Sequence, residues 1–232
     1  MKCKAIAFDF YMTLIHPRNN KSRGSAYQDF LSYYAIQADP WEHKILYDIF
    51  EFYADNYNPN AFETIKQSFW VKFTYRLFER TNVAGFDENM AQAYAETIRD
   101  IFGPTYFKIY SEVHETLHYL QSKNIKLAII SNWQRGLKYF CQELDIYRYF
   151  NEILASAEVG CQKPDAGIFK EAAKRFKLEP KEILHVGDSL TEDIQGASSA
   201  GFEVVLLDRT NENLSKNVTT ITNLSNLKEI FN

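Results

Sequence analysis

The strongest constraint on the fold of this chain is the alternation of short apolar runs with helix-length stretches after residue 110. The runs are 126–131, 153–156, 183–187 and 204–208, and amphipathic segments separate them. An earlier run, residues 3–10, reads CKAIAFDF and holds an acid near its end. Strands that alternate with helices form βαβ units and a parallel sheet. We therefore predict an α/β fold whose core is a Rossmann-like parallel sheet, with the earlier run as one of its strands.

Residues 17–107 interrupt this pattern and have a different composition. They hold 21 of the 36 aromatic residues (18 Phe, 15 Tyr and 3 Trp) and show no strand alternation. Helix-length amphipathic stretches occur at about 24–37, 40–53, 61–80 and 87–102. Asp39 followed by Pro40 is typical of a helix N-cap and first position. We expect a core domain of residues 1–16 and 108–232, with a helical-bundle cap domain inserted at 17–107.

The aromatic content of the expected cap bears on its ligands. The number of aromatic side chains exceeds what four short helices readily bury, so some are expected to face a cleft or a partner subunit. This predicts a substrate with an apolar body, and a homodimer. The cap has 9 basic and 12 acidic residues, which gives no support to polyanion binding.

The overall composition excludes several classes of protein. The 26 basic and 30 acidic residues give a net charge of −4, which argues against a nucleic-acid partner. No apolar run approaches the roughly 20 residues needed to cross a bilayer, and the first residues do not resemble a signal peptide. Three cysteines without CxxC spacing indicate neither a disulfide framework nor a zinc site. We expect a cytoplasmic protein with no membrane partner.

Polar residues follow the ends of the predicted strands. They are Asp9, Ser131, Asn132, Asp188 and Asp193, with Lys163 in a loop. Because the carboxyl ends of parallel strands open on one edge of a sheet, these side chains could converge there. A carboxylate can attack phosphorus or carbon, a hydroxyl and a lysine can hold anionic oxygens, and further carboxylates could place Mg²⁺. The pattern predicts an enzyme that acts on a small molecule.

Four motifs in this order resemble those of the haloacid dehalogenase (HAD) superfamily, and the resemblance covers nearly the whole chain. They are Asp9–Leu14, Ile129–Asn132, Lys163-Pro164-Asp165, and Gly187-Asp188 with Asp193. A helical cap of the C1 type, inserted directly after the first motif, is also a feature of that superfamily. The resemblance implies a HAD-like fold and a hydrolase with a phosphorylated small-molecule substrate.

The resemblance also implies a role for each matching residue. Asp9 corresponds to the nucleophile, and Lys163 to the lysine that orients it. Ser131 corresponds to the hydroxyl that binds the transferred group, with the Asn132 amide beside it. Mg²⁺ is expected to be held by Asp9, Asp188 and the main-chain carbonyl of residue 11, with support from Asp193. Trp133 follows the second motif and is expected to line or shield the substrate site.

Tyr11 departs from the phosphatase pattern. Phosphatases of the superfamily carry a second Asp at this position, which protonates the leaving oxygen and later activates water. The 2-haloacid dehalogenases are more similar here, because they carry Tyr, and a halide leaves without a proton. A Tyr with a reference pKa of about 10 is a poor base at neutral pH. The Gly187-Asp188 motif with Asp193 nevertheless follows the magnesium-binding phosphatase version.

Three interpretations follow from this conflict. The first is a Mg²⁺-dependent phosphohydrolase with a compromised acid/base step at Tyr11, and the two acids of the fourth motif favour it. The second is a dehalogenase-type hydrolase that attacks carbon. The third is a catalytically impaired phosphate-binding or partner protein.

Of the five histidines, His185 lies within a predicted strand and is expected to be a hydrogen-bonded core residue.

Overall fold

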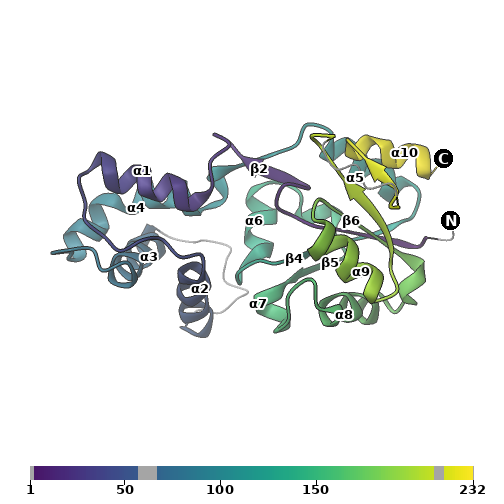
Figure 1. Cartoon of the computed structure of the whole chain (residues 1–232). Coiled ribbons are helices and arrows are strands. Elements are labelled where there is room, and N and C mark those ends of the chain that lie inside the picture. Colours follow the sequence, from purple (N-terminus) through teal and green to yellow (C-terminus); the bar gives the residue numbers. More distant parts are fainter. Residues whose placement is uncertain (1–2, 57–66, 212–216, 232) are drawn as a thin grey trace. The chain divides into compact units, whose positions relative to one another are not determined.

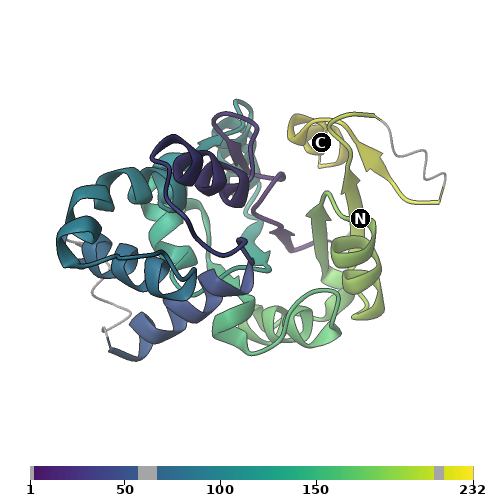
Figure 2. The ribbon, with the colours of Figure 1, turned by 60° about the vertical axis from the view of Figure 1, so that its left-hand side comes forward.

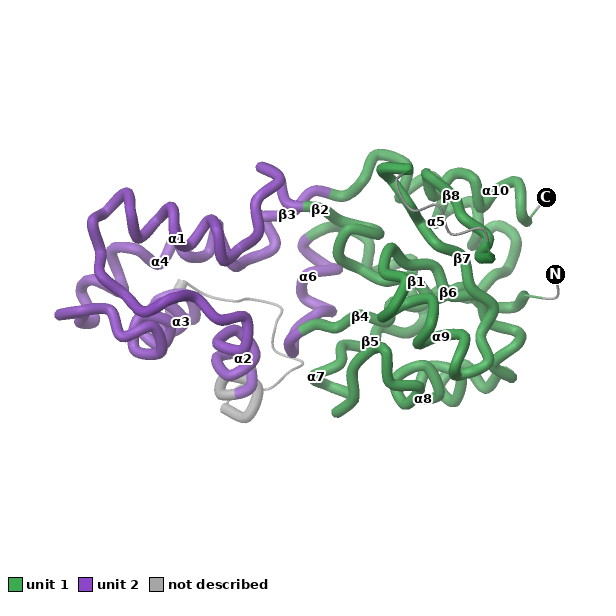
Figure 3. The backbone as a smooth tube through the Cα atoms, viewed as in Figure 1, with its two compact units in different colours: residues 1–16, 109–133, 144–232 green, residues 17–108, 134–143 purple. Residues whose placement is uncertain are grey.

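The computed structural model describes residues 3–56, 67–211 and 217–231 and divides the chain into two compact units (Figure 3). Unit 1 comprises residues 1–16, 109–133 and 144–232, and unit 2 comprises residues 17–108 and 134–143. This division differs from the expected core and cap mainly at residues 134–143, which group with the helical unit. Within unit 2, Arg135 Nε lies 3.1 Å from Glu51 Oε1 on α2 (Lys44–Asn56).

Unit 1 contains a six-stranded sheet in which every pairing is parallel. In spatial order its strands are β5 (Glu152–Ala155), β4 (Lys126–Ser131), β1 (Ala5–Phe8), β6 (Ile183–Gly187), β7 (Glu203–Leu207) and β8 (Thr220–Ile221). The register aligns Ala7 of β1 with Ala128 of β4 and His185 of β6. This is the Rossmann-like α/β fold that the alternating pattern predicts. The two-residue strand β8 is too short to be detected from such a pattern.

Helices cover both faces of this sheet. On one face, α8 (Ala166–Phe176) and α9 (Gly196–Ser199) pack on small side chains of the central strands (Figure 1). Alanines at 5, 7, 128 and 172 let these layers approach closely. On the other side lie α5 (Val113–Ser122) and α10 (Leu227–Ile230), which contact each other. Both ends of the described chain belong to this unit (Figure 2).

Two further elements lie close to the ends of the sheet strands. A short helix, α7 (Ser156–Val159), follows β5, and a π-helical turn, Leu190–Gln195, precedes α9. The expected helix at 193–200 is therefore two consecutive segments. Ser189 caps the turn, because its side chain accepts a hydrogen bond from the N–H of Glu192 (3.1 Å). This cap fixes the path of the chain between Asp188 and Asp193.

The chain passes between the units through two short strands. These are β2 (Ile15–Pro17) and β3 (Phe107–Ile109), which pair as a separate two-stranded sheet. Three residues are too few for an alternating pattern to be recognised, so the sequence did not indicate them.

Unit 2 is helical, and its core is aromatic. Its elements are α1 (Arg23–Tyr33), α2, α3 (Gln67–Arg80), α4 (Glu88–Phe102) and α6 (Leu137–Glu143). Phe69, Phe73 and Leu77 are buried together on one face of α3, as their spacing indicates. Ser22 and Asp87 cap α1 and α4 through hydrogen bonds to the N–H groups three residues later.

The start of one helix in unit 2 was predicted wrongly. Helix α2 begins at Lys44, not at Pro40. Asp39 does not cap it, since its carboxylate accepts a hydrogen bond from Asn82 Nδ2 (2.5 Å), and its N–H donates to the carbonyl of Thr81 (2.7 Å). These tertiary partners replace the expected local cap. The first part of the helix expected at 61–80 lies outside the described residues.

Among the helices that the structure describes, none is long and apolar enough to cross a membrane.

Candidate active site

Three adjacent strands bring several of the predicted site residues to one edge of the sheet. β1 lies between β4 and β6, with Phe8 in register with Ile129 and Val186. Asp9 follows β1 and donates its N–H to the carbonyl of Val186 (2.9 Å). Ser131 ends β4, and Asp188 follows β6 directly. The side chains of Asp9 and Ser131 are buried, whereas Asp188 is partly exposed.

Lys163 joins two of the carboxylates in the interior of unit 1. Its Nζ lies 2.6 Å from Asp9 Oδ1 and 2.5 Å from Asp193 Oδ1, and its side chain is only 1% exposed. Burial lowers the pKa of Lys163, but the charges of Asp9 and Asp193 outweigh it, so the net shift is upward. Burial raises the pKa of Asp193, but Lys163 and His185 outweigh it and hold that pKa well below its usual range. Both shifts favour the charged forms of Lys163 and Asp193.

Asn132 holds the main chain of Lys163 in place. The N–H of Lys163 donates to Asn132 Oδ1 (2.8 Å), and Asn132 Nδ2 donates to the carbonyl of Lys163 (2.9 Å). The same Nδ2 also lies 3.1 Å from Glu192 Oε2. The Asn132 side chain thus attaches the lysine loop to the end of β4, and its expected role in binding substrate stays a prediction.

Asp9, Asp188 and Asp193 form an acidic cluster. One oxygen of each carboxylate lies within 4.8 Å of the others. Burial, together with the charges of Asp9 and Asp193, raises the pKa of Asp188 to about 7. Burial also raises the pKa of Asp9, against the opposing charge of Lys163. Within the described residues Asp188 has no ion-pair partner, and Thr13 Oγ1 donates to its Oδ1 at 3.3 Å.

The cluster can bind a divalent cation. Its donors are carboxylate oxygens, which Mg²⁺ and Ca²⁺ prefer, and a cation would relieve the repulsion that disfavours ionised Asp188. The donor chemistry thus fits the metal that the sequence motif implies.

Tyr11 lies in a tight turn beyond the end of β1. Its side chain is 37% exposed. Met12 follows with a positive φ of 59°, and its N–H donates to the carbonyl of Ile15 (2.8 Å). The N–H of Leu14 donates to the carbonyl of Phe10 (2.9 Å). The turn therefore places a partly exposed phenol two residues from the Asp9 carboxylate.

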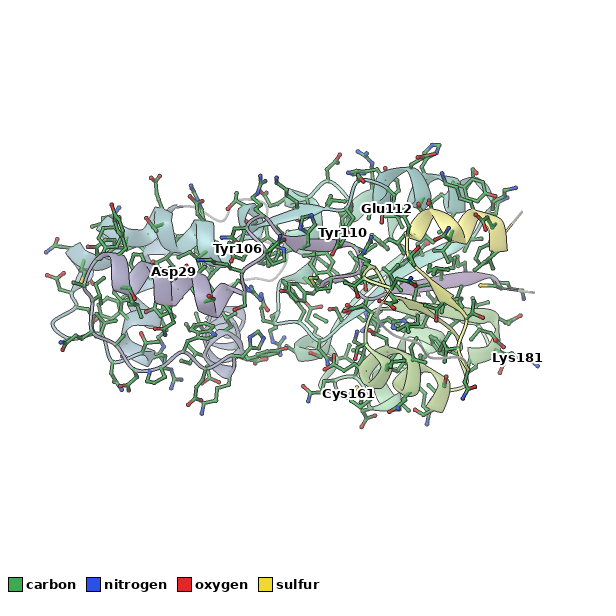
Figure 4. All side chains as sticks on the ribbon, turned by 45° about the horizontal axis from the view of Figure 1, so that its top comes forward. Asp29, Tyr106, Tyr110, Glu112, Cys161 and Lys181 are labelled. Carbon is green, nitrogen blue, oxygen red and sulfur yellow. The ribbon has the colours of Figure 1, made fainter. Side chains whose placement is uncertain are left out.

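Arg209 fastens this turn, although the sequence analysis did not identify it. It donates from Nη2 to the carbonyl of Thr13 (2.8 Å) and from Nε to that of Met12 (3.3 Å). Its Nη1 donates to Glu112 (2.7 Å), and its guanidinium lies 3.4 Å from the ring centre of Tyr110. Tyr110 and Glu112 follow β3 (Figure 4). The only signal in the sequence was the position of Arg209 just after a predicted strand.

Trp133 is a packed aromatic residue in unit 1. It is 4% exposed, and its ring stands perpendicular to that of Phe10 at a centroid distance of 5.1 Å. Its main-chain N–H donates to Ser156 Oγ, directly after β5 (3.2 Å). The ring thus packs against Phe10 of the loop after β1, while the main chain of Trp133 bonds to the segment after β5.

Comparison with known proteins identifies the family. The model of the haloacid dehalogenase-like hydrolase family matches residues 42–207, most of the chain. The chain belongs to the haloacid dehalogenase-like hydrolases. The match begins after Asp9 and so does not include the first motif, Asp9–Leu14.

Relatives of this hydrolase differ in their names. Over 130 residues it is 36% identical to the glyceraldehyde 3-phosphate phosphatase of Methanothermobacter thermautotrophicus, covering 50% of this chain and 55% of that protein. The structure of a 2-haloacid dehalogenase from Pseudomonas syringae is 25% identical, with a TM-score of 0.64 over 99% of this chain and 98% of that one. A HAD phosphatase from Thermococcus onnurineus shares the fold at 21% identity, with a TM-score of 0.62 over 98% and 97%. The hydrolase spans about half the length of the curated relatives it matches.

Proposed function

We propose that this hydrolase is a Mg²⁺-dependent phosphatase that uses Asp9 as nucleophile on small phosphorylated substrates. The observation that supports this most is the arrangement of Lys163 between Asp9 and Asp193, with Asp188 in the same acidic cluster. A phosphate-transfer site needs a held carboxylate, a fixed positive charge and a place for a divalent ion. Curated relatives named as glyceraldehyde 3-phosphate phosphatase and ribulose-1,5-bisphosphate 5-phosphatase support phosphate ester hydrolysis as the type of reaction.

Each residue has a distinct part in the proposed reaction. Lys163 binds Oδ1 of Asp9, so the second oxygen attacks phosphorus. The bond from Asp9 to phosphorus forms while the bond to the leaving oxygen breaks, and the leaving oxygen keeps the electron pair. Ser131 and the third N–H of the Lys163 ammonium would hold the transferred oxygens. Water then attacks the phosphorus of the aspartyl phosphate, which releases inorganic phosphate and restores Asp9.

Mg²⁺ would be held by Asp9, Asp188 and the carbonyl oxygen of Tyr11, with Asp193 in support. When bound, the ion would supply positive charge against the phosphate oxygens. The raised pKa of Asp188 supports this assignment, because that carboxylate is the member of the cluster with the least compensation from the described chain.

Tyr11 limits the proposed activity to substrates with good leaving groups. A phenol, whose reference pKa is about 10, is a poorer proton donor and acceptor at neutral pH than a carboxyl group. Acyl and aryl phosphates need little help from a proton, whereas alkyl phosphates need it. We also propose residues 17–107 as the cap domain that selects the substrate, and its high aromatic content favours an apolar substrate body.

Activity assays with and without metal test this proposal. We expect hydrolysis of p-nitrophenyl phosphate in Mg²⁺, none in EDTA, and much slower hydrolysis of alkyl phosphates. Tyr11→Asp should raise turnover of alkyl phosphates by about 100-fold or more, because general acid catalysis contributes about 10²–10⁴-fold. Tyr11→Asn is the matched control, because Asn has the shape of Asp but its amide cannot act as a general acid. Equal gains in both variants would refute the assignment of Tyr11.

Dehalogenation is the second candidate. Tyr11 and the similarity to a 2-haloacid dehalogenase structure favour it, and the acidic cluster argues against it because attack on carbon with a halide leaving group needs no metal. Halide release from 2-chloropropionate in the presence of EDTA would establish this reaction in place of phosphate hydrolysis.

A further inference from the structure

His185 is the one buried histidine of the five, and its position on β6 is unusual for a polar residue. It is fully buried and in register with Ala7 of β1 and Val204 of β7. The ring meets the edge of Phe169 on α8, at a centroid distance of 5.1 Å and an angle of 82°. An apolar residue would pack here without polar atoms to satisfy, so the reason for a histidine lies in its hydrogen bonding.

One ring nitrogen of His185 has a partner and the other has none. Nε2 lies 2.9 Å from Asp193 Oδ1. Nδ1 is buried, and no described residue bonds to it. Because ionised Asp193 can only accept a hydrogen bond, Nε2 carries the proton and donates it. Leaving Nδ1 unpaired in the core is unfavourable, so packing alone does not account for this residue.

Asp193 is held from several sides at once. Lys163 Nζ and His185 Nε2 both bond to Oδ1, and the N–H of Ser189 donates to Oδ2 (3.0 Å). Gly187 lies directly against the carboxylate, because a Cβ at that position would overlap the Asp193 side chain. Main-chain contact on one side and hydrogen bonds on the other leave this carboxylate a single orientation.

We propose that His185 is a positioning residue, which acts through Asp193 and Lys163 to hold the nucleophile Asp9. The connection is continuous: His185 donates to the Asp193 oxygen that also binds Lys163, and the Lys163 ammonium lies 2.6 Å from Asp9. Without His185, Asp193 loses one of the two donors on Oδ1 and can rotate. Lys163 then loses its fixed position between the two acids. This inference rests on the proposed function for the part that concerns catalysis.

Replacement of His185 by Leu and by Gln tests the proposal kinetically. Leu removes the donor, while Gln can place an amide N–H close to the position of Nε2. We expect His185→Leu to lower kcat for p-nitrophenyl phosphate by about 10–100-fold, the usual effect of losing a partner behind an active-site ligand, with KM changed less than threefold. His185→Gln should recover kcat to within about fivefold of the unmodified enzyme.

Val205→Ala is the matched structural control. Val205 is a buried residue of the neighbouring strand β7 and makes none of the hydrogen bonds around Asp193. It should reduce thermal stability with kcat nearly unchanged. If it lowers kcat as much as His185→Leu does, or if His185→Gln recovers nothing, His185 has only a structural role and the proposal is wrong.

The Lys163 ammonium offers a readout that does not need activity. Buried and bonded to two carboxylates, it should exchange slowly with water and give a ¹H–¹⁵N signal in lysine-labelled protein, assigned by its loss in Lys163→Met. His185→Leu should shift or broaden this signal, and His185→Gln should preserve it. An unchanged signal in His185→Leu overturns the inference. An inactive enzyme that still shows the expected spectral change would refute the phosphatase function and leave the positioning by His185 standing.

Discussion

Replacement of Asp188 by Asn is expected to stabilise the metal-free protein while abolishing its Mg²⁺ response. Asp188 is partly buried beside two other carboxylates, and its pKa is raised from 3.8 to about 7. A group whose pKa is raised on folding favours the folded state at low pH. That contribution is lost as the pH rises from about 4 through 7. The neutral amide of Asn does not ionise, so the stability of the folded state does not fall in this way in Asp188→Asn.

The size of the effect follows from the pKa shift. About three pKa units at about 1.4 kcal/mol each give about 4 kcal/mol of unfavourable free energy at pH 8. For a chain of this length, each kcal/mol changes Tm by about 2–4 °C. We therefore expect unit 1 of Asp188→Asn to melt about 10 °C higher than the unmodified protein at pH 8 in EDTA. At pH 4 the two should melt at similar temperatures.

Thermal melts in EDTA and in Mg²⁺, at pH 4 and pH 8, measure this. Mg²⁺ should raise the Tm of the unmodified protein at pH 8, and should have little effect on Asp188→Asn. Asp208→Asn is the control, because Asp208 is also a buried acid following a sheet strand but accepts a hydrogen bond from Thr210 Oγ1 (3.1 Å). If Asp188→Asn is no more stable than the unmodified protein at pH 8 in EDTA, the argument from carboxylate repulsion is refuted.

Three other substitutions have effects that follow from the same site. Lys163→Met leaves Asp9 and Asp193 without their cation, so it should lower the free energy of unfolding by about 3–5 kcal/mol at pH 8 and less at pH 5, measured by denaturant titration; equal losses at both pH values would contradict this. Arg209→Met frees the turn that carries Tyr11 and should lower kcat about tenfold in steady-state assays, with Arg209→Lys recovering only part because it cannot bond two carbonyls and Glu112 together. Gly187→Ala forces the Asp193 carboxylate away from β6 and should lower kcat as His185→Leu does; an active Gly187→Ala enzyme would show that the orientation of Asp193 is unimportant.

The sequence predicted the strands of the core sheet well because their signal is local. Apolar runs of four to six residues become β1, β4, β5, β6 and β7, and each boundary lies close to the predicted range. The helix at Pro40 failed because Asp39 bonds to Asn82, 43 residues away, and a local capping rule cannot anticipate that contact. The short strands β2, β3 and β8 were not predicted, because two or three residues are too few to show an alternating pattern of apolar and polar side chains.

For the candidate site as well, the sequence indicated which residues matter but not which partners they bond to. The sequence indicated Asp9, Asp188 and Lys163 from their motifs, and the parallel sheet explains why they meet. It did not indicate what each side chain bonds to. Asn132 bonds to the main chain of Lys163, and His185, a buried and hydrogen-bonded core residue as expected, has Asp193 as its partner. These partners depend on the directions of side chains in the folded protein, and the spacing of residues in the sequence does not indicate those directions.

By itself, the sequence determined which segments become strands and that acids, a hydroxyl and a lysine gather where those strands end. These properties are set by residue type and by periodicity along a short stretch of chain. Only the tertiary structure decided that Arg209 fastens the turn at Tyr11 and that the Asp193 carboxylate is fixed between His185, Lys163 and Gly187. The reason is physical: the orientation of a buried charge depends on donors brought in from distant parts of the chain, and those donors meet only when the sheet has formed.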